Sequence, residues 1–238
     1  MVCVRSSFKL GGPKLPVLAC VAAVLVVAIP ISGSQDEPEP ILRIEQDWKL
    51  VLNEPDQAVH APQFHTVMSP VGDLDSLYAQ VTWNWRELPD FAPGGLQIQG
   101  WADDECRLHR DFSSNELSTT AETLRWTQTM ETNGAVLTFA IINGQSATWG
   151  AFGGHSLQIQ GTAPIASLNN YDTNVSAANS VITYGSNRVD SLVITEVRYY
   201  GADGLLGTDS VPKVVYQGEQ ADQGGGDTPY SRLFNPLS

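Results

Sequence analysis

Trp101 and the amides that precede it form the part of the chain best suited to bind a ligand. Gln97, Gln99 and Trp101 alternate with Leu96 and Ile98, so a β-strand would place the first three on one face. A flat aromatic ring packs against the apolar face of a pyranose, and amides hydrogen-bond to its hydroxyls. We therefore predict that Trp101, Gln97 and Gln99 contact a neutral sugar.

Carboxylates follow this segment directly. Asp103 and Asp104 are adjacent in the sequence, and neighbouring carboxylates repel each other unless a cation neutralises them. Calcium prefers oxygen ligands, so Asp103 and Asp104 are candidate calcium ligands; no other cofactor is expected. The alternative is that they are simply solvated and pair with Arg107 or Arg110.

Sequence motifs for catalysis are absent. The chain has no Gly-x-Ser-x-Gly, no His-Glu-x-x-His and no phosphate-binding glycine loop followed by Lys and Ser or Thr. Cys106 and His109 lie close together, but zinc needs three or four convergent ligands. The interpretation of Cys106 that we favour is a small buried hydrophobe. We predict no catalytic residues.

The N-terminus has the pattern of an export signal. Arg5, Lys9 and Lys14 precede an apolar run from Leu15 to Ile31, and small residues follow it. This order is typical of a secretory signal peptide, which we assign to residues 1–34. An uncleaved anchor is the alternative, but the run is shorter than the roughly 20 residues that a membrane span needs. The sequence thus predicts a secreted, extracytoplasmic protein.

Charge narrows the range of partners. The chain has 13 basic and 26 acidic residues and a net charge of −13, and loss of residues 1–34 would remove basic residues alone. Such a chain repels phosphate backbones and anionic headgroups. We therefore expect no nucleic-acid partner and no membrane association after cleavage. Neutral or cationic partners remain, such as a glycan or another extracellular polymer.

Strand patterns dominate the rest of the chain. Alternation of apolar and polar residues predicts strands near 44–52, 79–85, 96–99, 124–130 and 135–142, and further strands near 145–151, 157–160, 180–184, 191–200 and 214–216. The pentapeptide Leu-Gln-Ile-Gln-Gly occurs at both 96–100 and 157–161. No helical period is sustained over three turns. We predict an all-β domain at 41–218, a single antiparallel two-sheet sandwich of about ten or more strands, and a disordered tail at 219–238.

Two Asn-Gly pairs supply the sharpest local prediction. Asn133-Gly134 and Asn143-Gly144 separate apolar segments, and both residue types accept the positive φ of type I′ turns. They predict two hairpins and three consecutive antiparallel strands.

The stretch from Arg125 to Gly154, followed by Asn187–Val193 and Val197–Tyr200, resembles secreted bacterial jelly-roll domains of the concanavalin A-like, laminin-G-like group. The resemblance implies a two-sheet sandwich that is often carbohydrate-binding, sometimes calcium-dependent and in some branches a glycoside hydrolase. The chain lacks the Glu-x-Asp-x-Glu type of strand that hydrolases of this group carry.

These observations favour a secreted, non-catalytic binding module for carbohydrate or an extracellular polymer. Two alternatives stay open: a glycoside hydrolase or lyase with carboxylates on separate strands, and a structural or assembly protein of a cell envelope. The oligomeric state is not predicted.

Overall fold

The computed structural model describes residues 38–52, 64–73, 76–85, 95–112, 117, 121–176 and 189–217. All of them belong to the second of the two units into which the chain divides, Pro38–Ser238. The predicted signal segment 1–34, the strand near 180–184 and the tail 219–238 lie outside the described residues. Among these residues, no helix is long and apolar enough to cross a membrane.

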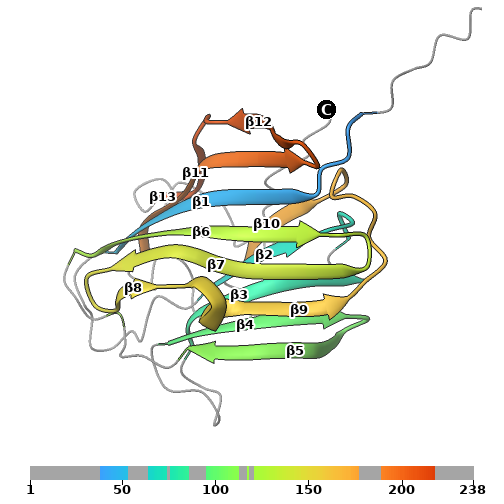
Figure 1. Cartoon of the computed structure of the whole chain (residues 1–238). Helices are drawn as coiled ribbons and strands as arrows, with labels where there is room; N and C mark the ends of the chain where they lie inside the picture. Colours follow the sequence, from blue (N-terminus) through green and yellow to red (C-terminus); the bar gives the residue numbers. More distant parts are fainter. Residues whose placement is uncertain are drawn as a thin grey trace, which may run out of the picture. The chain divides into compact units, whose positions relative to one another are not determined.

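The described residues form an antiparallel sandwich of two sheets, as the sequence predicts (Figure 1). The first sheet has the order β12-β11-β1-β6-β7-β8, with β13 also paired to β11 and β9 also paired to β7. Its strands are β1 (Arg43–Leu52), β6 (Thr123–Thr132), β7 (Val136–Ser146), β8 (Gly150–Phe152), β9 (Gln158–Thr162), β11 (Val189–Gly201), β12 (Gly204–Asp209) and β13 (Lys213–Gln217).

The second sheet has the order β10-β2-β3-β4-β5. Its strands are β2 (Phe64–Ser69), β3 (Leu77–Trp85), β4 (Gly95–Ala102), β5 (Glu105–Phe112) and β10 (Asp172–Ser176). A single turn of 3₁₀ helix, Gly154–Leu157, precedes β9.

Side-chain alternation places the core between the sheets. In β1 the even-numbered residues are buried and the odd-numbered ones half-buried, which is the period of two that a strand imposes. Val81 and Trp83 of β3, which belongs to the other sheet, are also fully buried. The predicted inward parity of these residues is therefore confirmed.

Three tryptophans join the two layers. Trp48 and Trp126 are partners across β1 and β6, with ring centroids 5.7 Å apart and nearly parallel planes. Trp83 of the other sheet approaches Trp126 to 4.1 Å between centroids. Because these rings bury large apolar areas and interlock across the layers, they hold the two sheets together.

The first predicted hairpin is present. β6 and β7 pair around Asn133-Gly134, and the Asn133 side chain accepts hydrogen bonds from the N–H groups of Ala135 and Val136. Only Gly134 takes a positive φ, of 86°, so the pair is not a type I′ turn.

The second predicted hairpin was placed wrongly. Asn143 and Gly144 lie inside β7, where Asn143 has a φ of 55° and the strand gains one residue relative to β6, which makes a β-bulge. The turn comes later because the buried carboxylate of Glu122 accepts hydrogen bonds from the Thr148 N–H and hydroxyl at 3.0 and 2.6 Å. The three-strand meander β6-β7-β8 itself is confirmed.

Candidate functional site

The predicted site residues lie on the outer face of the five-stranded sheet. Gln97, Gln99 and Trp101 alternate along β4 with the core residues Leu96 and Ile98. The register of β3 and β4 sets Thr82, Gln80 and Tyr78 beside Gln97, Gln99 and Trp101 respectively. The pattern that buries one side of these two strands therefore gathers aromatic rings and amides on the other.

A chain of side-chain hydrogen bonds runs along this face. The Trp101 indole N–H donates to Gln99 Oε1 at 3.1 Å, Gln99 Nε2 donates to Gln97 Oε1 at 2.6 Å, and Gln97 Nε2 donates to Asp111 Oδ1 at 2.9 Å. Gln80 Nε2 also donates to Gln99 Oε1. The chain fixes the orientation of the Trp101 ring and of each amide.

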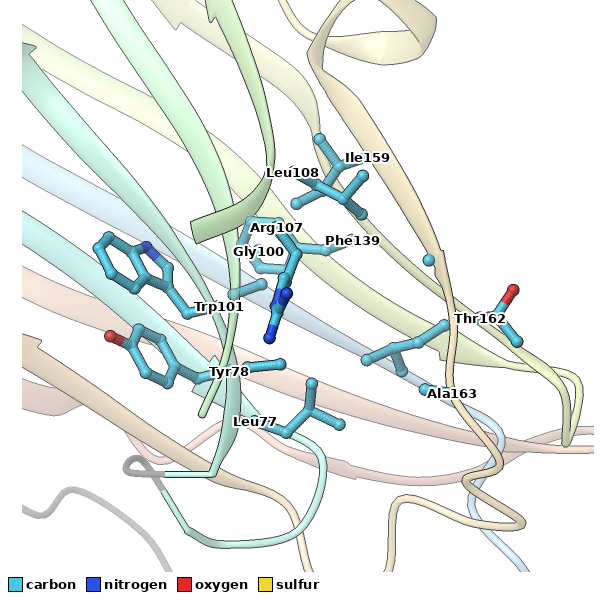
Figure 2. A pocket seen from close by; sticks show the side chains of 14 residues that line it. Leu77, Tyr78, Gly100, Trp101, Arg107, Leu108, Phe139, Ile159, Thr162 and Ala163 are labelled. Carbon is cyan, nitrogen blue, oxygen red and sulfur yellow. The ribbon is translucent and has the colours of Figure 1, made fainter. Parts of the chain in front are cut away.

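Tyr78 and Trp101 form a pair of aromatic rings. Their centroids are 6.0 Å apart, and the ring planes differ by only 5°. Figure 2 shows the two rings beside each other, on the side of the strands away from Leu108 and Ile159. We call Tyr78, Trp101, Gln80 and Gln99 the ring-and-amide face.

Burial divides the predicted residues into two groups. Trp101 and Gln99 are half-buried, whereas Gln97 is only 6% exposed. Gln97 is therefore placed to orient Gln99 and to bind Asp111 rather than to meet a ligand directly. Tyr78 and Gln80 were not predicted as site residues, although they alternate with the buried residues Ala79 and Val81 along β3.

Asp103 and Asp104 form the two-residue turn between β4 and β5. Both have positive φ, 51° and 62°, as a type I′ hairpin requires, and both side chains are exposed. Arg107, which we expected to pair with them, instead pairs with the neighbouring Glu105 at 2.7 Å. Within the described part of the chain, no three His, Cys, Asp or Glu side chains converge as a metal site would need.

Cys106 is exposed, in contrast to the prediction of a buried hydrophobe. It lies on β5, an edge strand of its sheet, where both faces carry exposed residues. Its thiol donates to the Leu108 carbonyl at 3.4 Å. Partial burial of the sulfur raises its pKa, which this hydrogen bond only partly offsets, so the thiol form is favoured.

Carboxylates gather on the outer face of the eight-stranded sheet around Arg198. The guanidinium binds Glu45 at 3.0 Å, Asp47 at 2.6 Å and Glu196 at 2.5 Å. Burial acts to raise the pKa of Asp47, but hydrogen bonds from Arg198 and Thr127 outweigh it, and the pKa lies below its usual value. A carboxyl kept ionised in this way is suited to an ion pair and not to the proton donation of a glycosidase acid.

A broad depression of about 660 Å³ lies at one end of the sandwich. Arg43, Glu131, Asn133 and Tyr200 contribute its polar lining, and the Arg43 guanidinium lies 4.0 Å from the centre of the Tyr200 ring. It offers one aromatic ring already covered by a cation, whereas the ring-and-amide face offers two neighbouring rings.

Comparison with known proteins does not assign the chain to a family. The sandwich architecture follows from the two antiparallel sheets themselves, and the jelly-roll resemblance stays a prediction. No protein-family model, no curated protein and no solved structure matches the chain.

Proposed function

We propose that the protein is a non-catalytic binding module for carbohydrate or a similar neutral extracellular polymer. The observation that carries the proposal is the parallel pair of Tyr78 and Trp101 beside a row of glutamine amides. Apolar ring faces and amide groups are the two features that sugar recognition needs together.

The two rings are held ready for binding. Each has few rotatable bonds, so little conformational entropy is lost on contact, and the hydrogen bond from Trp101 to Gln99 restricts its ring further. A ligand that stacks on a preorganised ring loses less affinity to ordering of the protein.

The glutamine amides can donate a further hydrogen bond to a ligand. Gln99 Nε2 carries two hydrogens and gives one to Gln97, which leaves a second donor for a sugar hydroxyl. Asp111 lies at the far end of the hydrogen-bond chain and is exposed. This acid, together with the net charge of −13, favours neutral or cationic sugars over anionic ones.

The proposal is tested by affinity electrophoresis of the full chain through gels that contain neutral polysaccharides. Trp101→Ala should lose retention, with a rise in Kd of roughly 30-fold, the effect of removing a central contact worth about 2 kcal/mol. Trp101→Phe should keep part of the retention because a ring remains. Tyr200→Ala, which removes a ring from the opposite sheet, should be retained like the wild type.

Three results would reject the proposal. One is a wild-type chain that no polysaccharide retards. Another is unchanged retention of Trp101→Ala with an unaltered circular dichroism spectrum. The third is loss of retention in Tyr200→Ala alone, which would move the site to the depression around Arg43 and Tyr200.

A further inference from the structure

A cavity of about 130 Å³ lies between the two sheets, on the inner side of β3 and β4. Figure 2 shows side chains from both layers around it, with Leu108 on one strand and Phe139 and Ile159 on others. Tyr78 and Trp101, whose rings belong to the ring-and-amide face, also contribute to its lining. Its lining is formed by Leu77, Tyr78, Ala79, Gly100, Trp101, Ala102, Arg107, Leu108, Leu137, Phe139, Ile159, Gly161, Thr162 and Ala163.

The cavity is apolar and has the size of a small organic group. Its wall includes Leu77 of one sheet and Leu137, Phe139 and Ile159 of the other. An apolar cavity of about 150 Å³ can take up a molecule such as benzene, and this one opens to the surface beside the exposed residues Arg107 and Leu108. A group of about six carbon atoms therefore fits here.

The two copies of the repeated pentapeptide meet at this cavity. Gly100 and Gly161, the last residue of each copy, lie on either side of Leu108: a Cβ on Gly100 would come within 3.5 Å of Leu108 Cβ, and one on Gly161 within 3.1 Å of Leu108 Cδ1. Leu108 is 37% exposed, so its side chain reaches from the surface into the cavity. The two glycines give this leucine the room to form one wall of an opening.

Among the described residues of the lining, Arg107 alone carries a charge. In Figure 2 its side chain runs away from Leu108 and Ile159, toward Leu77 and Tyr78. Its partner is Glu105 at 2.7 Å, and the two side chains are 57% and 64% exposed. Exposed ion pairs are weak, so a ligand carboxylate can replace Glu105 on the guanidinium.

We propose that this cavity binds a short-chain carboxylate, with the alkyl chain between the sheets and the carboxylate on Arg107. The site goes beyond the proposed glycan-binding function, because Arg107 and apolar side chains of both sheets would hold the ligand, although Tyr78 and Trp101 border both sites. Transfer of the apolar alkyl chain from water into the cavity favours binding. The charge-assisted contact with Arg107 favours an anionic head group over a neutral one.

The test is a titration of the full chain with sodium hexanoate and, separately, with 1-hexanol. The methyl resonances of Leu108 and Ile159 report binding by nuclear magnetic resonance. We expect both resonances to shift with hexanoate, and a Kd at least tenfold lower for hexanoate than for hexanol. Ala163→Leu, which fills the cavity, should abolish both titrations while its circular dichroism spectrum stays that of the wild type.

Charge variants separate the head group from the chain. Arg107→Gln should raise the Kd for hexanoate to that of hexanol, whereas Arg125→Gln, an exposed arginine on the other sheet, should change neither value. Glu105→Gln should lower the Kd for hexanoate several-fold because it removes the competing carboxylate. Absence of methyl shifts with either compound would overturn the site, and equal Kd values for the two compounds would overturn its assignment to carboxylates.

Discussion

At the scale of single residues, hydrogen bonds between buried polar side chains connect the two layers. Thr66 of the five-stranded sheet donates to Gln128 of the other sheet at 2.8 Å and accepts from the Trp83 indole N–H at 3.2 Å. The Thr173 hydroxyl donates to the Val67 carbonyl of its own sheet at 2.8 Å, and its oxygen lies 3.4 Å from Gln46 Oε1 of the other sheet. Because a buried polar group without a partner is costly, these bonds favour one relative position of the sheets over others.

His65 makes stability depend on pH. It is 4% exposed, its Nδ1 lies 2.9 Å from the Thr82 hydroxyl, and desolvation by burial lowers its pKa from 6.5 to about 4. The unfolded chain therefore binds a proton between these pH values that the folded chain does not. Stability is complete above pH 6.5 and falls as the pH drops toward 4, by up to about 3 kcal/mol.

Urea unfolding at pH 7, 6, 5 and 4.5 measures this loss. His65→Gln should flatten the dependence above pH 5, and His109→Gln, an exposed histidine, should leave it as in the wild type. A wild-type free energy of unfolding that stays constant from pH 7 to 4.5 would contradict the burial of a neutral His65.

The three residues predicted to share one face of a strand do so, but they are less exposed than their polarity suggests. Alternation along β4 put Gln97, Gln99 and Trp101 on one side, and the structure has them there. Polarity suggested that all the amides meet solvent, yet Gln46 and Gln128 are in the core and Gln97 is nearly covered. A glutamine's partner is set by tertiary contacts, which a single strand pattern does not contain.

At the scale of elements, alternation of apolar and polar residues predicted the strands that bury one face and expose the other. β5 was missed because an edge strand with exposed residues on both sides shows no alternation. β2 was missed because His65 and Thr66 are polar and buried. The Asn143-Gly144 hairpin was misplaced because the Glu122 carboxylate, distant in the sequence, fixes the later turn.

A substitution at Gly144 tests how closely the β-bulge in β7 packs against Phe152. A Cβ at this position would overlap the ring of Phe152, which is itself buried against Trp83 and Trp149. Gly144→Ala should therefore lower the free energy of unfolding by about 1–3 kcal/mol, the usual cost of overpacking. Phe152→Leu in the same chain should recover part of the loss, as a double-mutant cycle would measure.

Gly207→Ala is the matched control for this substitution, because nothing lies within 4 Å of its Cβ position and its φ is not in the left-handed region. It should change stability by less than about 0.5 kcal/mol. Equal losses for the two substitutions would contradict overlap with Phe152 as the cause of the loss at Gly144.

At the scale of the whole sandwich, the repeated Leu-Gln-Ile-Gln-Gly pentapeptide occurs once in each of the two sheets. The pentapeptide at 96–100 lies in β4 of one sheet and that at 157–161 leads into β9 of the other. Both bury their Leu and Ile residues, and Gly100 and Gly161 flank the same leucine. The sequence showed that the pentapeptide is repeated. It did not show that the two copies lie close together, because the order in which strands pair is a property of the assembled sheets.

Sugar binding at the ring-and-amide face through Trp101 can be observed directly. The most direct measurement follows the indole N–H resonances of the ¹⁵N-labelled full chain during titration with oligosaccharides cut from a retarding neutral polysaccharide. Binding at the ring-and-amide face should move the Trp101 resonance, while those of the buried Trp48 and Trp126 stay in place. A Trp101 resonance that does not move at saturating ligand would contradict it.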